Sequence, residues 1–272
     1  VLAKAFYIAK SGRPGPVLID ITKDAQFEMF DFNYSKVTGI RSYKPVPKLD
    51  TTSLNLAADL INKAAKPMIV WGQGVILSKA EKEFQAFVEK TGIPAAWTIM
   101  GVSAIPTSHP LNVGMVGMHG NYAPNLLTNE CDLLVAIGMR FDDRVTGKLD
   151  EFACHAQVIH VDIDPAEVGK NRTPQVGIVG DVKEFIQDLL ELLKKEGNID
   201  LEQVKAWRNR LNRWRNEYPL LVPKNANNLS PQEVISQISS NSNKAYFTTD
   251  VGQHQMWAAQ FIKTSQRRWL TS

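Results

Sequence analysis

Five short, continuous apolar segments recur along the chain, and helical patterns separate them. The segments cover residues 68–71, 95–97, 133–137, 158–161 and 177–179. Apolar runs without polar alternation are typical of parallel strands that are buried on both faces. Strands that alternate with helices at this spacing predict a doubly wound α/β domain with a mostly parallel sheet over residues 50–196.

The helices between these segments have recognisable start and stop signals. We expect Thr52 or Ser53 to cap the helix before the first segment, and residues 78–81 to form a capping box that opens the next helix. Gly92 is expected to end that second helix, and Asp181 to cap the last one. The signals agree with the strand and helix alternation.

The two ends of the chain repeat this alternation only in part. A helical face at residues 2–9 precedes a strand-like run at 17–21, whereas a capping box at 230–233 precedes a strand at 245–249 and a further helix. Neither end supplies the layer on which these pieces should pack. We therefore expect an interior fragment of a larger protein, with a helix and linker at 197–228.

Composition and charge argue against several classes of protein. The 272 residues are 44% hydrophobic and carry a net charge of only +3, far from the basic field of a nucleic-acid binder. No apolar run approaches the ~20 residues of a membrane span, and no signal peptide is recognisable. Cys131 and Cys154 are too few for a disulfide framework or a thiolate zinc site, so we expect both to be buried. The expected protein is soluble and intracellular, with neither nucleic acid nor membrane as partner.

One basic and aromatic stretch resembles a nucleic-acid-binding patch. Its apolar residues recur at steps of three and four, which is the spacing of one helical face: Val204, Trp207, Leu211, Trp214 and Tyr218. We favour an amphipathic helix with a buried stripe and a solvated basic face over the nucleic-acid interpretation.

The residues that directly follow each strand are the candidate ligand contacts, because open α/β sheets bind ligands outside the carboxyl ends of their strands. These segments are 72–74 (Gly-Gln-Gly), 98–101, 138–144, 162–164 and 180–181. Glycines let backbone amides approach a pyrophosphate, Arg140 can pair with it, and strand-end carboxylates can accept ribose hydroxyls. A dinucleotide is the expected ligand, although Leu77 stands where the NAD fingerprint needs a third glycine. A tight βα turn is the alternative interpretation of residues 72–74.

A long loop at residues 113–120 is rich in methionine and glycine. Loops beyond ~12 residues in compact domains are usually functional or disordered, and this composition is not typical of disorder. We expect the loop to lie against a flat aromatic ring, with simple packing as the alternative.

Five motifs, in order over essentially the whole chain, resemble acetolactate synthase, the thiamine-diphosphate enzyme also called acetohydroxyacid synthase large subunit. They are GRPGPVLIDITKD at 12–24, MVGMHG at 115–120, GMRFDDRVTGKL at 138–149, HVDIDPAEVGKN at 160–171 and DVGQHQMWAAQF at 250–261. The resemblance implies three α/β domains in the whole protein. Residues 1–30 would end the N-terminal pyrimidine-binding domain, 50–196 would form the central FAD-binding domain, and 229–272 would begin the C-terminal thiamine-pyrophosphate-binding domain.

The resemblance also implies roles for individual residues. It places Lys23, Asp143 and Arg144 along the substrate channel, and Val251, Gly252, Gln253 and His254 at the thiamine diphosphate. No catalytic residue and no metal ligand falls within the chain. The implied FAD contacts are Arg13, Gly72, Gln73, Gly74, Thr98, Ile99, Met100, Gly117, Met118, His119, Gly120, Gly138, Met139, Arg140, Phe141, Asp142, Asp162, Ile163, Asp181 and Val182.

The implied reaction is a condensation of two 2-keto acids with loss of CO2, at the head of branched-chain amino-acid synthesis. Thiamine diphosphate and Mg²⁺ serve the reaction, and FAD is structural. The activating glutamate and the magnesium motif would lie outside this chain, so the fragment alone is expected to be inactive. A homodimer, a regulatory small subunit, and a cytoplasmic, plastid or mitochondrial location are further implications. The alternatives are a sister enzyme such as glyoxylate carboligase or pyruvate oxidase, and a non-catalytic FAD-binding module.

Overall fold

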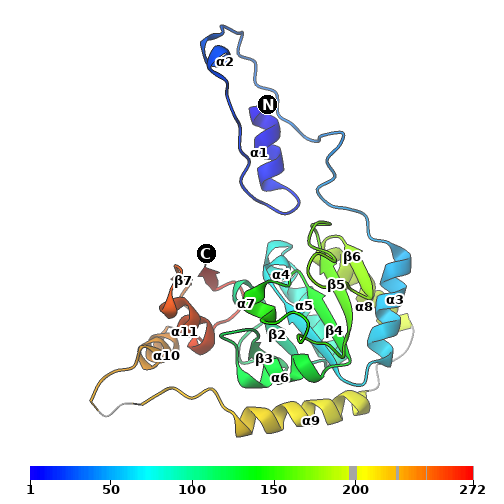
Figure 1. Ribbon diagram of the computed structural model, residues 1–272, viewed down its shortest axis with the longest axis vertical. Helices are drawn as coiled ribbons and strands as arrows, with labels where there is room; N and C mark the ends of the chain where they lie inside the picture. The colour runs from blue at the N-terminus through cyan, green and yellow to red at the C-terminus, as the bar shows by residue number, and fades with distance from the viewer. Residues whose placement is uncertain (196–200, 225–226, 243, 272) are drawn as a thin grey trace. The chain divides into compact units, whose positions relative to one another are not determined.

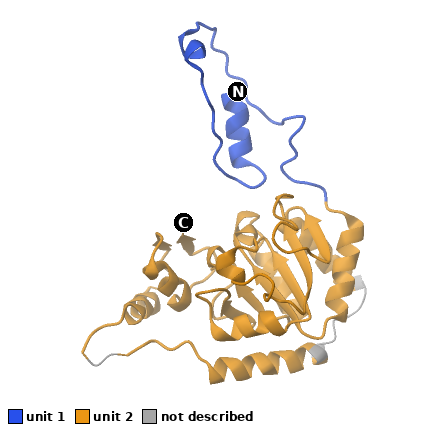
Figure 2. Ribbon diagram, viewed as in Figure 1, with its two compact units in different colours: residues 1–48 blue, residues 49–272 orange. Residues whose placement is uncertain are grey.

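The computed structural model describes residues 1–195, 201–224, 227–242 and 244–271. The chain divides into two compact units, Val1–Lys48 and Leu49–Ser272 (Figure 2). The predicted boundaries at residues 197 and 229 fall inside the second unit and stay predictions.

The first unit contains little regular structure. Its helices are α1 (Leu2–Lys10) and α2 (Lys23–Phe27). The strand predicted at residues 17–21 is wrong, because the segment pairs with no strand among the described residues of the unit. Leu18 is 94% exposed. A strand pattern alone does not form a strand where no neighbour accepts its backbone hydrogen bonds.

The second unit is built on six parallel strands in the order β3-β2-β1-β4-β5-β6 (Figure 1). The strands are β1 (Pro67–Trp71), β2 (Ala95–Trp97), β3 (Asn112–Met115), β4 (Leu133–Ile137), β5 (Gln157–Asp162) and β6 (Val176–Val179). The doubly wound α/β fold and all five predicted strands are confirmed. The prediction missed β3 and treated residues 113–120 as loop, because β3 is short and contains Asn112 and Gly114.

Helices cover both faces of this sheet, and alternate residues of β1 show how. Ile69 and Trp71 belong to the core beneath α3 (Thr51–Lys63), α5 (Glu81–Thr91) and α8 (Val182–Lys195). Met68 and Val70 belong to the core beneath α6 (Tyr122–Glu130) and α9 (Leu201–Glu217). Three short elements follow the carboxyl ends of strands. They are α4 (Gln73–Leu77) after β1, the 3-10 turn η1 (Ile99–Gly101) after β2, and α7 (Asp143–Thr146) after β4.

Two of the predicted helix caps are wrong. Asp50, rather than Thr52 or Ser53, caps α3, and its carboxylate accepts a hydrogen bond from the Ser53 backbone N–H at 2.9 Å. Ser78 does not cap α5, because its hydroxyl donates to the Gly74 carbonyl at 2.8 Å and so closes α4. The stop at Gly92 and the cap at Asp181 are confirmed.

The basic and aromatic stretch forms α9, with the predicted buried stripe. Val204, Trp207, Leu211 and Trp214 are buried, and the Trp207 indole N–H donates to the Pro67 carbonyl at 3.0 Å. Tyr218 is half exposed. The aromatic residues therefore fasten the helix to the sheet.

The C-terminal part adds α10 (Pro231–Asn241), β7 (Phe247–Thr249), α11 (Gln253–Phe261) and β8 (Trp269–Thr271), and β7 pairs with β8 in parallel. Ser230 caps α10 as predicted. Ala258 and Trp269 join the same core as α3, α5 and α8. Helix α11 is thereby packed against the sheet domain.

Three further properties concern the cysteines, membrane spans and metal sites that the sequence analysis considered. Cys131 is buried as predicted, but Cys154 is exposed, because it lies in a surface turn rather than in a strand or helix. No helix in the described ranges is long and apolar enough to cross a membrane. Among the same residues, no cluster of three or more His, Cys, Asp or Glu side chains could hold a metal ion.

Candidate functional site

The strand order reverses between β1 and β4, and the loops that follow these two strands meet at the reversal. The Gly72 N–H donates to the Ile137 carbonyl at 3.0 Å, and the Gly74 N–H donates to the Gly138 carbonyl at 2.9 Å. A Cβ on Gly138 would lie 2.6 Å from the Gly74 Cα, and Gly138 has a φ of +56°. Only glycines allow this approach, at the position where doubly wound sheets bind their ligands.

The segment after β4 adds a cation to the glycines. Arg140 is exposed, and its Nε lies 3.5 Å from a carboxylate oxygen of Asp142. The other Asp142 oxygen caps α7 by accepting from the backbone N–H groups of Arg144 and Val145 at 3.0 and 3.3 Å. Asp142 is thus a structural cap that also orients Arg140, whose guanidinium remains available to an anion at the edge of the sheet.

The segment after β2 is held by two indole groups that the sequence analysis did not single out. The Trp71 N–H donates to the Gly101 carbonyl at 2.8 Å, and the Trp269 N–H donates to the Ile99 carbonyl at 3.2 Å. Thr98 is buried, while Ile99 and Met100 are half buried. These contacts fix the backbone at Ile99 and Gly101, on either side of Met100.

The loop at residues 115–120 lies against α7 and α11. The Met118 N–H donates to the Arg144 carbonyl at 2.8 Å, and the Gln260 side chain donates to the His119 carbonyl at 2.7 Å. Asn125 exchanges two hydrogen bonds with Gly117, at 2.9 and 3.0 Å. The structure therefore brings the predicted flavin loop, Arg144 of the predicted channel, and α11 together.

Met118 and His119 are exposed, and a pocket of about 300 Å³ opens beside this loop. Gly117 and Met118 line it together with Val145 and Lys148. The sequence analysis missed Asn125; its only signal was an asparagine-rich segment directly after the loop.

The carboxylates at the end of β5 and just after β6 are partly engaged in local structure. Asp162 accepts from the Asp164 N–H at 2.9 Å, and Asp181 accepts from the Lys183 and Glu184 N–H groups at 2.8 and 3.2 Å. Val182 is buried, and its predicted contact with a ligand stays a prediction.

Two predicted residues belong to the other compact unit. Arg13 and Lys23 lie within Val1–Lys48 and are exposed. Their roles toward FAD and substrate stay predictions.

The residues predicted for thiamine diphosphate lie at the start of α11. Val251 and His254 are exposed, Gly252 is the N-cap, and Gln253 is the first helical residue. The cap has no side-chain hydrogen bond. Free backbone N–H groups at a helix start suit a phosphate.

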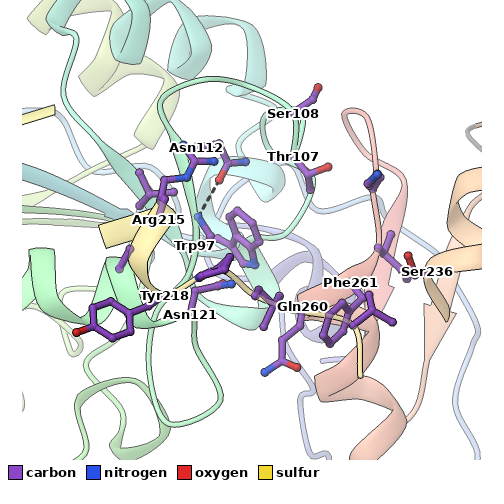
Figure 3. Close-up of a pocket in the computed structure, with 18 residues that line it drawn as sticks. Trp97, Thr107, Ser108, Asn112, Asn121, Arg215, Tyr218, Ser236, Gln260 and Phe261 are labelled. Atoms are coloured by element: carbon purple, nitrogen blue, oxygen red, sulfur yellow. Dashed lines mark hydrogen bonds between the residues drawn. The ribbon is translucent and has the colours of Figure 1, made fainter. Parts of the chain in front are cut away.

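A second pocket, of about 620 Å³, adjoins the loop at residues 113–120, because Val113 and Gly114 are among its lining residues (Figure 3). Its wall includes Trp97, Asn112, Arg215, Tyr218 and Gln260, which come from β2, β3, α9, the segment after α9, and α11. None of its lining residues is a predicted cofactor contact. The predicted cofactor contacts therefore lie in the loops that follow the strands, at the carboxyl edge of the sheet, rather than in this pocket.

Comparison with known proteins agrees with this geometry. The family model described as thiamine pyrophosphate enzyme, central domain, matches residues 54–189, which contain all six strands of the sheet. Acetolactate synthase large subunits from Porphyra purpurea and Cyanidium caldarium are 49% and 47% identical over all of this chain. Acetolactate synthase from Mycobacterium bovis is 46% identical over all of it. The chain covers 46%, 47% and 44% of these three proteins, so it spans about half the length of the curated relatives it matches.

Proposed function

Because this chain belongs to the thiamine pyrophosphate enzyme family, through its central domain, we propose that the whole protein is an acetolactate synthase. It would condense two pyruvates, or pyruvate and 2-ketobutyrate, with loss of one CO2. The products would be 2-acetolactate or 2-aceto-2-hydroxybutyrate, precursors of valine, leucine and isoleucine. The observation that carries this proposal is the identity of 42–49% to proteins of that name over the whole chain.

We further propose that the loop edge of the sheet binds FAD. The fit rests on the touching glycine loops at the strand reversal, the exposed guanidinium of Arg140 and the carboxylate of Asp162 at the end of β5. The pyrophosphate would lie at Gly72 and Gly138, and the adenosine at Asp162. The flavin ring would lie between residues 98–100 and 117–120, as a structural group without net redox change.

Arg144 is the proposed contact for the substrate carboxylate. Its side chain is 73% exposed and its nearest carboxylate, Asp143, lies 3.6 Å away, a surface pairing that is worth little. Its carbonyl is fixed by the Met118 N–H, so the residue is held beside the flavin loop. A guanidinium can bind a 2-keto acid carboxylate through two parallel hydrogen bonds.

Thiamine diphosphate, when bound with Mg²⁺, supplies the electron sink for decarboxylation. Residues 251–254 would bind its phosphate end at the start of α11. The contact of Gln260 with the flavin loop holds α11 against the domain that binds FAD. The activating glutamate and the magnesium ligands would be supplied by other parts of the whole protein, so the 272-residue chain alone would be inactive.

The proposed protein works as a homodimer or larger assembly, with a regulatory small subunit as a further proposed partner. It would be cytoplasmic in a bacterium, and plastid or mitochondrial in a eukaryote.

Product analysis of the full-length protein tests the proposed reaction. The protein is incubated with pyruvate, thiamine diphosphate, Mg²⁺ and FAD, and acetolactate is measured against a reaction without thiamine diphosphate. Acetolactate that depends on thiamine diphosphate is the expected result. A parallel incubation contains glyoxylate. Turnover of glyoxylate, or oxidation of pyruvate instead of carboligation, would identify a sister enzyme, whereas reversible flavin reduction without carboligation would identify a flavin-binding module.

A further inference from the structure

The segment at residues 138–141, after β4, is tied down by two side chains that come from another motif. The His160 Nε2 lies 2.9 Å from the Met139 carbonyl oxygen, and the Asn171 side chain donates to the Phe141 carbonyl at 2.6 Å. His160 lies on β5 and Asn171 lies beyond it, at the two ends of the HVDIDPAEVGKN motif. Side chains of the HVDIDPAEVGKN motif therefore bond to two backbone carbonyls of the GMRFDDRVTGKL motif.

The surroundings of His160 define its protonation. A carbonyl oxygen only accepts, so Nε2 carries the proton and donates it to Met139. The imidazole is fully buried, and burial lowers the pKa of His160 below its ordinary value, which keeps it neutral. The Phe141 ring packs edge-to-face on the imidazole, with 5.0 Å between ring centres.

The other ring nitrogen of His160 makes an unfavourable contribution to the stability of the fold. Nδ1 is buried and has no hydrogen-bond partner in the described part of the chain. An unpaired buried acceptor is unfavourable, and an apolar residue at this position of β5 would avoid it. The bond from Nε2 to Met139 is the interaction that such a replacement would lose.

The two bonds control which groups the segment can present. A carbonyl that accepts from a donor inside the protein cannot turn its oxygen toward an anion bound outside. The carbonyls of Met139 and Phe141 are both held in this way. Carbonyl oxygens repel a phosphate, whereas the N–H groups of the segment and the guanidinium of Arg140 attract it.

We infer that His160 and Asn171 are positioning residues, which hold residues 138–141 in the conformation that receives the pyrophosphate of the flavin. The inference rests on the proposed function, because it deepens the assignment of the FAD site. Neither residue touches the flavin in this account. Each acts by fixing one carbonyl.

The test compares variants of the full-length, flavin-free protein by FAD titration, followed by flavin fluorescence. His160→Leu and Asn171→Ala each remove one donor, and each is expected to weaken FAD binding about tenfold. His160→Gln keeps an N–H donor at similar reach and is expected to restore most of the affinity. Because Asn171 is exposed, its variant tests the inference even if the buried histidine tolerates no replacement.

A matched control separates positioning from general stability. Thr91→Val also removes a buried donor, to the Phe87 carbonyl at 2.9 Å, but in α5 and away from the segment. It should lower the unfolding temperature without changing the FAD affinity. Hydrogen exchange supplies the second readout: residues 138–142 should exchange faster in the His160 and Asn171 variants, while β4 stays protected.

Three outcomes have distinct meanings. Weaker FAD binding with faster local exchange, and rescue by His160→Gln, supports the inference. Unchanged FAD affinity in folded His160→Leu and Asn171→Ala overturns it, while leaving the flavin site intact. Failure of the unmodified protein to bind FAD overturns the proposed site, and this inference with it.

Discussion

Replacing Gly138 by alanine tests whether the contact between the loops after β1 and β4 is as close as the structure shows. The new Cβ would lie 2.6 Å from the Gly74 Cα and 3.0 Å from the Gly74 carbonyl carbon. Both atoms belong to the backbone, so the strain cannot be relieved by turning a side chain. The two loops must separate.

The magnitude follows from two contributions. A φ of +56° costs an L-residue about 1–2 kcal/mol, and forcing backbone apart in a packed region costs about 1–3 kcal/mol more. Gly169→Ala is the matched control, because Gly169 also has a positive φ, of +79°, while its Cβ would make only an ordinary contact of 3.8 Å with Pro174. The control should cost about 1–2 kcal/mol, from the backbone alone.

Urea unfolding followed by circular dichroism, with both variants side by side, measures the difference in unfolding free energy. We expect Gly138→Ala to be about 1–3 kcal/mol less stable than Gly169→Ala. We also expect only Gly138→Ala to weaken FAD binding in the full-length protein. Equal stability and equal flavin affinity of the two variants would refute the argument from the close approach.

Three other predictions address substrate, pH and thiol chemistry. Arg144→Met in the full-length enzyme should raise the KM for pyruvate roughly 10- to 100-fold without changing the FAD affinity, because one charge-assisted pairing is lost; steady-state kinetics and a flavin titration check this. Because burial lowers the pKa of His160, the unfolded chain binds the proton first as the pH falls. The contribution of His160 to stability is therefore complete above its ordinary pKa of 6.5 and is lost as the pH drops below that value; urea unfolding at pH 7.5 and 5.5 should show a smaller loss in His160→Gln. Burial raises the pKa of Cys131 to about 12. A thiol reagent should therefore modify the exposed Cys154 in the folded chain and reach Cys131 only after unfolding. A second fast-reacting thiol in the folded chain would contradict the structure.

The sheet was predictable because most of its strands are apolar at every position, which is the composition expected of strands that are buried on both faces. Residues 133–137 are apolar throughout and are buried throughout. Strand β3 lacks this signal, since Asn112 and Gly114 interrupt it, and it forms because β2 offers an unpaired edge. The run at residues 17–21 shows the converse, an apolar pattern without a neighbouring strand.

The candidate site was predictable only as a set of strand-end loops. The residues that fix those loops do so by bonding to backbone groups. Trp269 bonds to Ile99, which is far away in the sequence, and Asn125 bonds to Gly117, eight residues earlier; neither contact follows from a helix or strand periodicity. The cap signal at Ser78 misled for a local reason, because the hydroxyl bonds back to Gly74 and closes α4 instead of opening α5. Roles that depend on ligand contact, such as those of Arg13 and Lys23, stay predictions.

The most direct test of the account is an equilibrium titration of the flavin-free, full-length protein with FAD, with NAD as a parallel ligand. The glycine loops at the strand reversal, the guanidinium of Arg140 and the carboxylate of Asp162 predict saturable binding of one FAD per chain. Leu77, in place of the third glycine of the NAD fingerprint, predicts no comparable binding of NAD. Folded protein that does not bind FAD, or that binds NAD in its place, would contradict the account.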